Sequence, residues 1–263
     1  MVRLYGLFIK TYIKQLLEYR FSFFTSIILQ IVDYASEFLL IWIIIRQVEN
    51  INGWTFYELL FLYSMNLLSY ALSGMFVKHP MLDFEKMVQM GDFDIALTKP
   101  MPTLFYVISR QYEYTFWGHV LLSVMTISFC ADKINVKWDV IHILMFAAFM
   151  FGAVLIQAAF MIFGGCMSFF FVKSQMIVKT AIFGLRGFLT YPLSIYPLFV
   201  QAVMTFLLPY AFVNYYPCEV FLGKGDMMFP GVCMWSPAVG IVMIIGVIWL
   251  WNVGVRRYES VGN

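Results

Sequence analysis

The charged side chains that this sequence could use for chemistry are concentrated in one short segment, residues 78–100. The segment holds seven of the 32 charged residues, which are 17 Lys and Arg plus 15 Asp and Glu. They are Lys78, Asp83, Glu85, Lys86, Asp92, Asp94 and Lys99. The chain as a whole is 62% hydrophobic. A compact segment of mixed charge between two apolar stretches indicates a surface that binds a soluble partner.

Motifs for nucleotide hydrolysis, metal binding and nucleophilic catalysis are missing. The chain has no G-x-x-x-x-G-K-[ST] loop, and the nearest string, at residues 222–225, lacks the first glycine and the Ser/Thr. It also lacks H-E-x-x-H and G-x-S-x-G. The histidines are scattered at His79, His119 and His142. We therefore expect neither a cofactor in this chain nor an enzyme activity of its own.

Three further charges interrupt apolar runs: Asp33, Glu37 and Arg186. A charge at mid-membrane costs about 2.5–3.5 kcal/mol on insertion scales. Asp33 and Glu37 lie four residues apart and so share one helix face. This face either lines a cavity or meets a partner subunit, or its carboxylates pair with Arg186 or with hydroxyl groups to hold helices together. An enzyme acting inside the membrane would need more polar residues on that face than the sequence offers.

The composition places the chain in the membrane as a single transmembrane domain, residues 1–263. Charged residues make up 12%, against about 25% in soluble domains. The mean hydropathy is +0.81, and the net charge of +2 gives no reason to expect nucleic acid binding. The four cysteines form no C-x-x-C pair. Cys218 and Cys233 either pair in one external loop or stay isolated apolar thiols, and isolated thiols are favoured.

The apolar runs predict an all-α polytopic membrane protein with six transmembrane helices. The predicted spans are 21–45, 57–77, 104–131, 140–172, 177–191 and 236–254. Residues 1–20 alternate apolar and charged positions, which predicts an amphipathic helix on the membrane surface, or else a charged flank to the first span. The run 140–172 exceeds the length of one straight span, and Gly164-Gly165 would break it, kink it or pack closely against a neighbour.

Residues 192–230 are apolar but hold four prolines before Glu219, namely Pro192, Pro197, Pro209 and Pro217. Proline disrupts helix interiors, so a re-entrant external helical hairpin before the last span fits better than a straight span. The positive-inside rule then sets the orientation. With a cytoplasmic N-terminus, twelve Lys and Arg lie inside or at the inner boundary and four lie outside. Both termini and residues 78–100 are therefore expected in the cytoplasm.

Four strings, in this order along the chain, carry a resemblance to a known family. They are Gly91-Asp92-Phe93-Asp94 followed by Leu97 and Lys99-Pro100, then Tyr191–Pro197, Leu208–Pro217 and Gly254–Gly262. Together with the predicted arrangement, they resemble the membrane (permease) subunit of bacterial type-2 ATP-binding-cassette (ABC) transporters, in the stand-alone branch without a fused ATPase. The resemblance covers essentially the whole chain.

The resemblance implies partners in place of catalytic residues. Two separate cytoplasmic ABC ATPase subunits would bind ATP and Mg²⁺, and a second permease subunit, identical or different, would complete the pathway among the membrane lipids. A coupling helix within 78–100 would dock on each ATPase. Pro80 fits the first turn of that helix, and Gly91 fits its C-terminus. The residues expected to couple are Asp83, Phe84, Glu85, Lys86, Asp92, Phe93 and Asp94. The alternative is a solvated loop that links two spans.

In this interpretation, ATP closes the ATPases and the spans rock between inward-open and outward-open forms. An aromatic group in the re-entrant segment would gate the outer mouth: Tyr196, Phe199, Tyr210 and Phe212. The apolar lining favours export of a hydrophobic or amphipathic substrate. The expected location is the bacterial inner (plasma) membrane. A membrane scaffold or assembly subunit without transport of its own is the alternative, and it predicts membrane partners without dependence on ATP.

Overall fold

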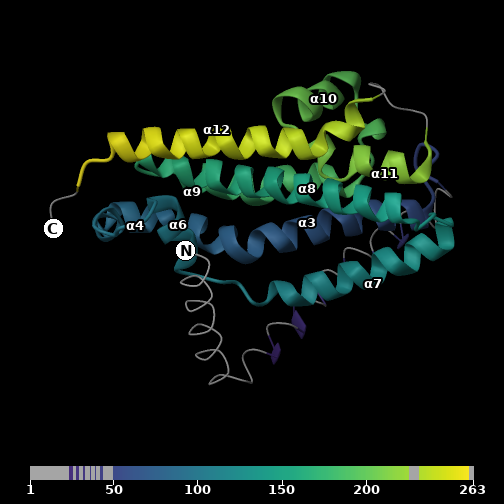
Figure 1. Ribbon diagram of the computed structural model, residues 1–263, viewed down its shortest axis with the longest axis horizontal. Helices are drawn as coiled ribbons and strands as arrows, with labels where there is room; N and C mark the ends of the chain where they lie inside the picture. Colours follow the sequence, from purple (N-terminus) through teal and green to yellow (C-terminus); the bar gives the residue numbers. More distant parts are fainter. Residues whose placement is uncertain are drawn as a thin grey trace.

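The computed structural model describes residues 50–224 and 231–260, together with residues 24, 25, 28, 29, 32, 36, 39, 42 and 43. Asp33, Glu37 and the predicted surface helix 1–20 lie outside the described residues, as do most of the predicted span 21–45 and the side chains of Arg186 and Cys233. Within the described ranges the regular elements are all helices, which confirms the all-α class (Figure 1).

Four long helices form the body of the molecule, and shorter helices gather near their ends (Figure 1). The long helices are α3 (Phe56–Leu82), α7 (Phe116–Ile134), α8 (Val140–Cys166) and α12 (Ser236–Arg257). The short α-helices are α4 (Phe84–Gln89), α5 (Phe93–Leu97), α6 (Thr103–Ser109), α9 (Gln175–Lys179), α10 (Leu198–Ala202) and α11 (Tyr215–Leu222). The 3-10 and π turns are η1 (Met167–Phe169), η2 (Thr180–Gly184), η3 (Leu185–Thr190), η4 (Leu193–Ile195), η5 (Val203–Leu207), η6 (Tyr210–Phe212) and η7 (Val232–Trp235).

Among the described residues, three helical stretches are long and apolar enough to cross a membrane: Phe56–Gln89, Val140–Phe169 and Ser236–Arg257. They match the predicted spans 57–77, 140–172 and 236–254. The range 104–131 does not form one continuous helix, because α6 and α7 divide it and residues 110–115 between them are not helical. Its role as a membrane span stays a prediction. The predicted span 177–191 is an irregular helical stretch made of α9, η2 and η3. The count of six spans stays a prediction.

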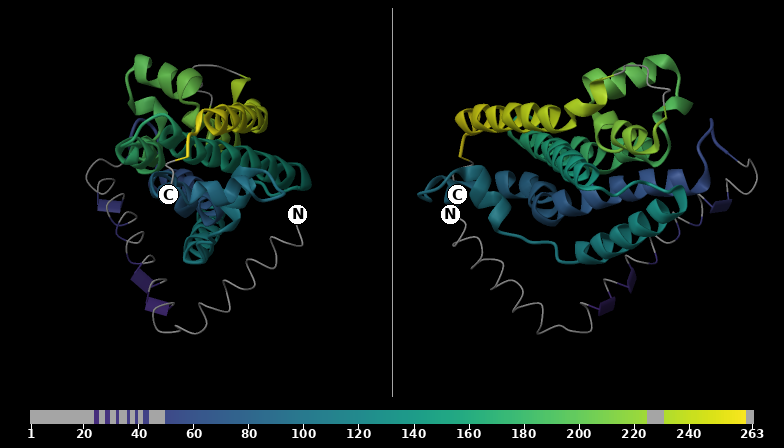
Figure 2. Two further views of the ribbon diagram at one scale, coloured as in Figure 1. Left: turned by 90° about the vertical axis from the view of Figure 1, so that its left-hand side faces the viewer. Right: turned by 45° about the vertical axis from the view of Figure 1, so that its right-hand side comes forward.

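The long helices pack in layers, with α8 between α12 and α3, and α3 between α8 and α7. The right-hand view of Figure 2 shows α8 crossing obliquely between its two neighbours. Glycine permits the close crossing with α12, because a Cβ atom on Gly152 would lie 2.5 Å from the carbonyl carbon of Ser236. Most side chains of α3 from Leu59 to Met81 are buried, so this helix forms the centre of the described core.

The glycine pair in α8 packs closely against neighbours and does not break the helix, which continues to Cys166. A Cβ atom on Gly164 would lie 3.2 Å from the Cα of Val178 in α9, and one on Gly165 would lie 2.4 Å from the Sδ of Met81 in α3. Of the three alternatives for this pair, close packing is confirmed.

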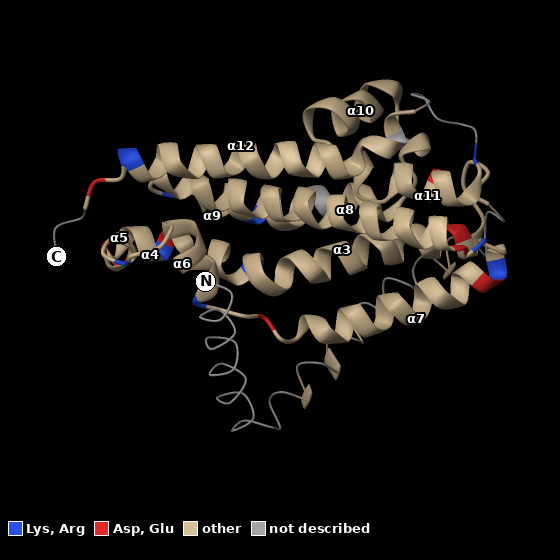
Figure 3. Ribbon diagram, in the orientation of Figure 1, with Lys and Arg blue, Asp and Glu red and all other residues tan. Residues whose placement is uncertain are grey.

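Most charged residues lie toward the two ends of the bundle, and few lie between them (Figure 3). We call the end with α4, α5, α6 and the C-terminus of α12 the α4 end. The opposite end, with α11, the C-terminus of α7 and the N-termini of α3 and α8, is the α11 end (Figure 1). The α4 end carries the segment 78–100 and is the candidate site.

Candidate functional site

The segment 78–100 is a helical hairpin built from α4 and α5. The chain leaves α3 at Asp83, and α4 begins at the next residue. The prediction that Pro80 opens the docking helix is wrong, since Pro80 lies inside the last turn of α3. Gly91 turns the chain after α4 with a φ of +77°, a left-handed conformation that glycine adopts without strain. Asp92 precedes α5, but its side chain makes no capping hydrogen bond there.

Five rings join this hairpin to the ends of α8 and α12, and we call them the aromatic cluster: Phe84, Phe93, Phe169, Trp251 and Tyr258. The ring centroids of Phe84 lie 5.4 Å from Phe93, 5.0 Å from Phe169 and 4.7 Å from Trp251. Phe84 and Phe93 are both 0% exposed. Edge-to-face packing of this kind adds about 0.5–1.5 kcal/mol per pair beyond the burial itself. The α4–α5 hairpin is therefore held firmly on the two long helices.

Phe84 and Phe93 are buried in the core of the chain, so their rings do not lie on the surface of the hairpin. Their expected role in coupling stays a prediction. Their rings fasten the hairpin, while other residues form its outer surface. Trp251 extends the same cluster to α6, because its Nε1–H donates to the Thr103 hydroxyl at 3.0 Å. No local pattern marks Trp251 in the sequence, whereas Tyr258 lies in one of the strings that carry the family resemblance.

Glu85 also turns inward, although it was expected on the polar face of the docking helix. Its side chain is buried, and its Oε2 accepts hydrogen bonds from the Ser174 amide at 2.6 Å and the Ser174 hydroxyl at 2.7 Å. Its Oε1 accepts from Gln89 Nε2 at 3.2 Å. Glu85 therefore binds the loop that follows η1. A tertiary contact explains why its side chain points inward, because the loop supplies the hydrogen-bond donors that a buried carboxylate requires.

The outward surface of the hairpin combines charge with apolar side chains. Asp83, Lys86 and Asp92 are exposed. Exposed apolar residues lie beside them: Met90 (54%), Ile95 (51%) and Leu97 (45%). We call these six residues the outer hairpin surface. Large exposed apolar side chains among charges are typical of a protein–protein contact.

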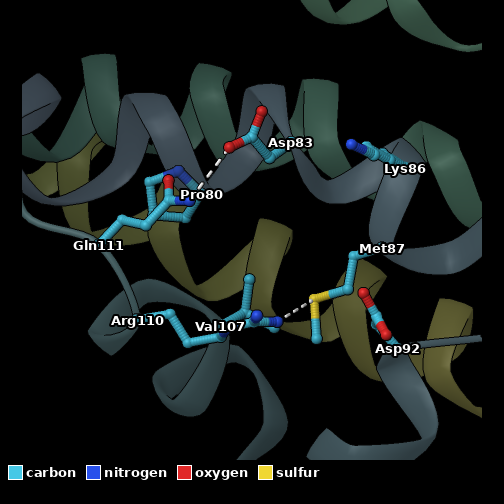
Figure 4. A pocket seen from close by; sticks show the side chains of 8 residues that line it. All are labelled: Pro80, Asp83, Lys86, Met87, Asp92, Val107, Arg110 and Gln111. Carbon is cyan, nitrogen blue, oxygen red and sulfur yellow. Dashed lines mark hydrogen bonds between the residues drawn. The ribbon is translucent and has the colours of Figure 1, made fainter. Parts of the chain in front are cut away.

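A polar cavity of about 230 Å³ opens beside this surface, between α4 and the residues around α6 (Figure 4). Asp83, Lys86, Asp92, Arg110 and Gln111 line it with polar groups. Asp83 Oδ2 accepts from Gln111 Nε2 at 3.1 Å, and the Arg110 guanidinium contacts the Met87 Sδ at 3.3 Å. Two carboxylates and two cations face one hollow, which suits a polar side chain from a partner.

Asp94 links the hairpin to the residues after α12. Its Oδ2 accepts from the Ser260 hydroxyl at 2.5 Å. Burial, together with the neighbouring Asp94 carboxylate, raises the pKa of Tyr258 above its usual value, so this phenol stays protonated at neutral pH. Asp94 thus contacts the C-terminal residues and is not a cap of α5.

The four predicted gate residues do not form one surface. Phe199 is 78% exposed, whereas Tyr210 and Phe212 are only 3% and 4% exposed and lie in the core. Tyr210 stacks on Phe160 of α8 at 4.2 Å. Tyr196 is half-buried and packs against Phe188. Their gating role stays a prediction. Tyr210 and Phe212 are buried, whereas Phe199 is exposed.

At the α11 end the structure reveals an ion pair that the sequence reading missed. Lys224 Nζ lies 2.8 Å from Glu58 Oε2, and both side chains are largely buried. The same ammonium donates to the Gly53 carbonyl at 2.6 Å and lies 4.8 Å from the centre of the Trp54 ring. The Thr55-x-x-Glu58 spacing is a capping-box signal that could have marked Glu58. Nothing local marks Lys224 as its partner.

Comparison with models of known protein families shows the family of this helical chain. The model of the family described as ABC-2 family transporter protein matches residues 31–262, which is most of the chain and includes α3 to α12. The chain belongs to this family. Neither the curated proteins nor the solved structures include a match.

Membership makes this chain a multi-pass permease subunit of an ABC transporter. Subunits of ABC-2 transporters work with ABC ATPases and dimerise. Among the described residues, no group of three or more His, Cys, Asp or Glu could hold a metal ion. The outer hairpin surface is exposed, and the aromatic cluster behind it joins the hairpin to η1 and α12.

Proposed function

We propose that separate ABC ATPase subunits dock on the outer hairpin surface and drive export of a hydrophobic or amphipathic substrate. The observation that carries this proposal is the division of the hairpin into two sides. Its inner side is buried in the aromatic cluster, and its outer side exposes Lys86, Asp92 and Ile95. A partner that grips the outer side moves the hairpin, and the rings pass that movement to α8 and α12.

The proposal places the α4 end in the cytoplasm, with both termini on the same side of a bacterial inner membrane. Its support is the charge distribution, since exposed cations gather at this end. They are Lys86, Lys99, Arg110, Lys173, Arg256 and Arg257. A second permease subunit, identical or different, completes the pathway.

ATP-driven closure of two ATPases then rocks the long helices as rigid bodies between inward-open and outward-open forms. The close α8–α12 crossing at Gly152 supports joint movement of these helices. The support for an apolar substrate is a cavity of about 260 Å³ beside α8, α9 and η2. Phe160, Phe163, Met176 and Leu208 are among its lining residues, and Thr180 is the polar one.

The docking test removes the outer side chains and leaves the aromatic cluster intact. We expect the triple variant Lys86→Ala, Asp92→Ala, Ile95→Ala to fold normally, to lose most co-purification with the ATPase and to lose stimulated ATP hydrolysis. The matched control is Asp132→Ala with Lys133→Ala, two exposed charges at the α11 end. Unchanged association and hydrolysis in the triple variant would overturn the docking assignment.

The transport proposal has its own measurement. The chain and its ATPase, reconstituted together in vesicles, are expected to move a fluorescent amphipathic lipid across the membrane only with hydrolysable ATP. Flux that is equal with ATP and with a non-hydrolysable analogue would overturn the transport proposal.

A further inference from the structure

The loop that follows η1, residues 170–174, lies against the α4–α5 hairpin. Gln89 Nε2 of α4 donates to the Val172 carbonyl at 2.5 Å, and Glu85 accepts both Ser174 hydrogen bonds. Gln175 Nε2 donates back to the Leu82 carbonyl at 3.0 Å. Four side-chain hydrogen bonds therefore join two loops that are more than 80 residues apart in the sequence.

Two large apolar side chains of this loop are exposed instead of being buried against other residues. Phe171 is 52% exposed and Val172 is 81% exposed, and Lys173 beside them is exposed too. Residues 171–174 are not helical. Irregular backbone does not face the hydrocarbon of a bilayer, because its polar groups would have no partner there. The loop therefore lies outside the hydrocarbon, where an exposed Phe-Val pair calls for a protein contact.

A hollow of about 400 Å³ continues from α4 to this loop and to the end of α12. Val88, Phe171 and Val172 line it with apolar groups, while Arg257 and Glu259 add one charge of each sign. Its composition matches that of the outer hairpin surface, which also mixes apolar side chains with both signs of charge. Because Gln89 touches the loop and Met90 follows directly, the two surfaces are continuous.

We propose that the loop 170–174 is the second half of the ATPase-binding surface, and that Glu85 is the positioning residue that holds the two halves together. This inference rests on the proposed docking function and extends it. The occupant is the same ABC ATPase subunit, which covers Phe171 and Val172 together with Met90. Movement of the ATPase then reaches α8 at two points, through the aromatic cluster and through this loop.

The test places a photo-crosslinking amino acid, p-benzoylphenylalanine, at one position of the full chain, which is co-expressed with its ATPase. The positions are Val172, Met90 and, as a control, Leu121, which is 61% exposed on α7 away from both loops. We expect ATPase cross-links from Val172 and Met90 and none from Leu121, with the products identified by mass spectrometry.

The outcomes separate this inference from the function on which it rests. ATPase cross-links from Met90 without any from Val172 would overturn the two-loop surface and leave the docking proposal standing. The absence of ATPase cross-links from both positions would overturn the docking proposal itself. A Val172 product that contains another protein in place of the ATPase would also sink the inference.

The role of Glu85 is tested in the Val172 cross-linking background. We expect Glu85→Ala to lower the Val172 cross-link by about tenfold, in keeping with the loss of charge-assisted hydrogen bonds, and to leave the Met90 cross-link in place. Glu85→Gln keeps an acceptor for Ser174 and should restore most of the Val172 product. The matched control is Asp132→Ala, which removes an exposed carboxylate at the α11 end, away from both halves of the proposed surface. Equal loss at Val172 and Met90 would show general unfolding and overturn the positioning role.

Discussion

Different interactions hold the chain at the two ends of this bundle: aromatic packing at the α4 end and a largely buried ion pair at the α11 end. At the α4 end, buried rings hold the α4–α5 hairpin, and several charged residues of the hairpin, such as Lys86 and Asp92, face outward. At the α11 end, an ion pair holds a residue just after α11 to the start of α3, because Lys224 and Glu58 pair with both side chains largely buried. A surface that exposes charge can exchange partners in water, whereas a buried ion pair holds one arrangement. The difference supports the proposed binding of a partner at the α4 end, and at the α11 end the ion pair joins Lys224 to the start of α3.

The largest effect is expected from removal of a ring at the α4 end. Trp251 is 1% exposed and contacts Phe84, Phe93 and Phe169. Trp251→Ala should lower the free energy of unfolding by about 3–5 kcal/mol, because it leaves a cavity in the core. Thermal unfolding of the purified protein measures the change.

The control for this variant is Trp249→Ala on the same helix, since Trp249 is 67% exposed. It should unfold close to the wild-type temperature. If Trp251→Ala and Trp249→Ala have equal effects, the α4 end does not depend on its aromatic cluster, and the contrast between the ends fails.

A smaller effect is expected from the buried ion pair at the α11 end. Lys224→Met leaves Glu58 without its ammonium and should cost about 1–3 kcal/mol of stability, because a largely buried acceptor loses its charged partner. The Thr55 amide still donates to Glu58 Oε2 at 2.7 Å, which limits the loss. Chemical denaturation of the variant measures it.

A double variant tests whether the unpaired Glu58 carboxylate causes the loss of stability in Lys224→Met. Lys224→Met combined with Glu58→Gln removes the stranded charge and should be more stable than Lys224→Met alone. Additive losses in the double variant would contradict coupling between the two side chains.

The smallest effect concerns an ion pair at the α4 end, between His79 Nε2 and Glu113 Oε2 at 2.5 Å. Burial alone would raise the pKa of Glu113, but hydrogen bonds and charge from His79, with help from Thr115 and Lys78, hold it below its usual 4.5. A carboxyl group whose pKa is lowered in the folded state stabilises the protein at pH values above its usual pKa. This stabilisation is lost as the pH falls through the lowered pKa.

Wild-type protein should therefore melt at a higher temperature than Glu113→Gln at pH 7, and the gap should close as the pH drops below 4.5. Melting curves of both proteins across this range supply the measurement, with Asp132→Asn as an exposed carboxyl control. A gap that stays constant with pH would rule out ionisation of Glu113 as its source.

Much of the architecture could be predicted from local pattern. The apolar runs predicted α3, α8 and α12, since the membrane requires long uninterrupted apolar helices. Gly91 predicted the turn after α4, because few other residues adopt its backbone conformation. The prediction of one continuous helix over 104–131 failed although the break has a local signal, because Arg110, Gln111 and Glu113 lie between α6 and α7.

The sequence by itself determined the class of protein, an all-helical membrane chain, and showed a dense cluster of charge at residues 78–100. Only the tertiary structure decided which residues of that segment are exposed and which are buried. Helices as short as α4 and α5 have too few turns to define an apolar face. The orientation of both helices is set by contacts with Phe169, Ser174 and Trp251. These residues lie about 75 to 170 residues further along the chain, so only the folded chain brings them close.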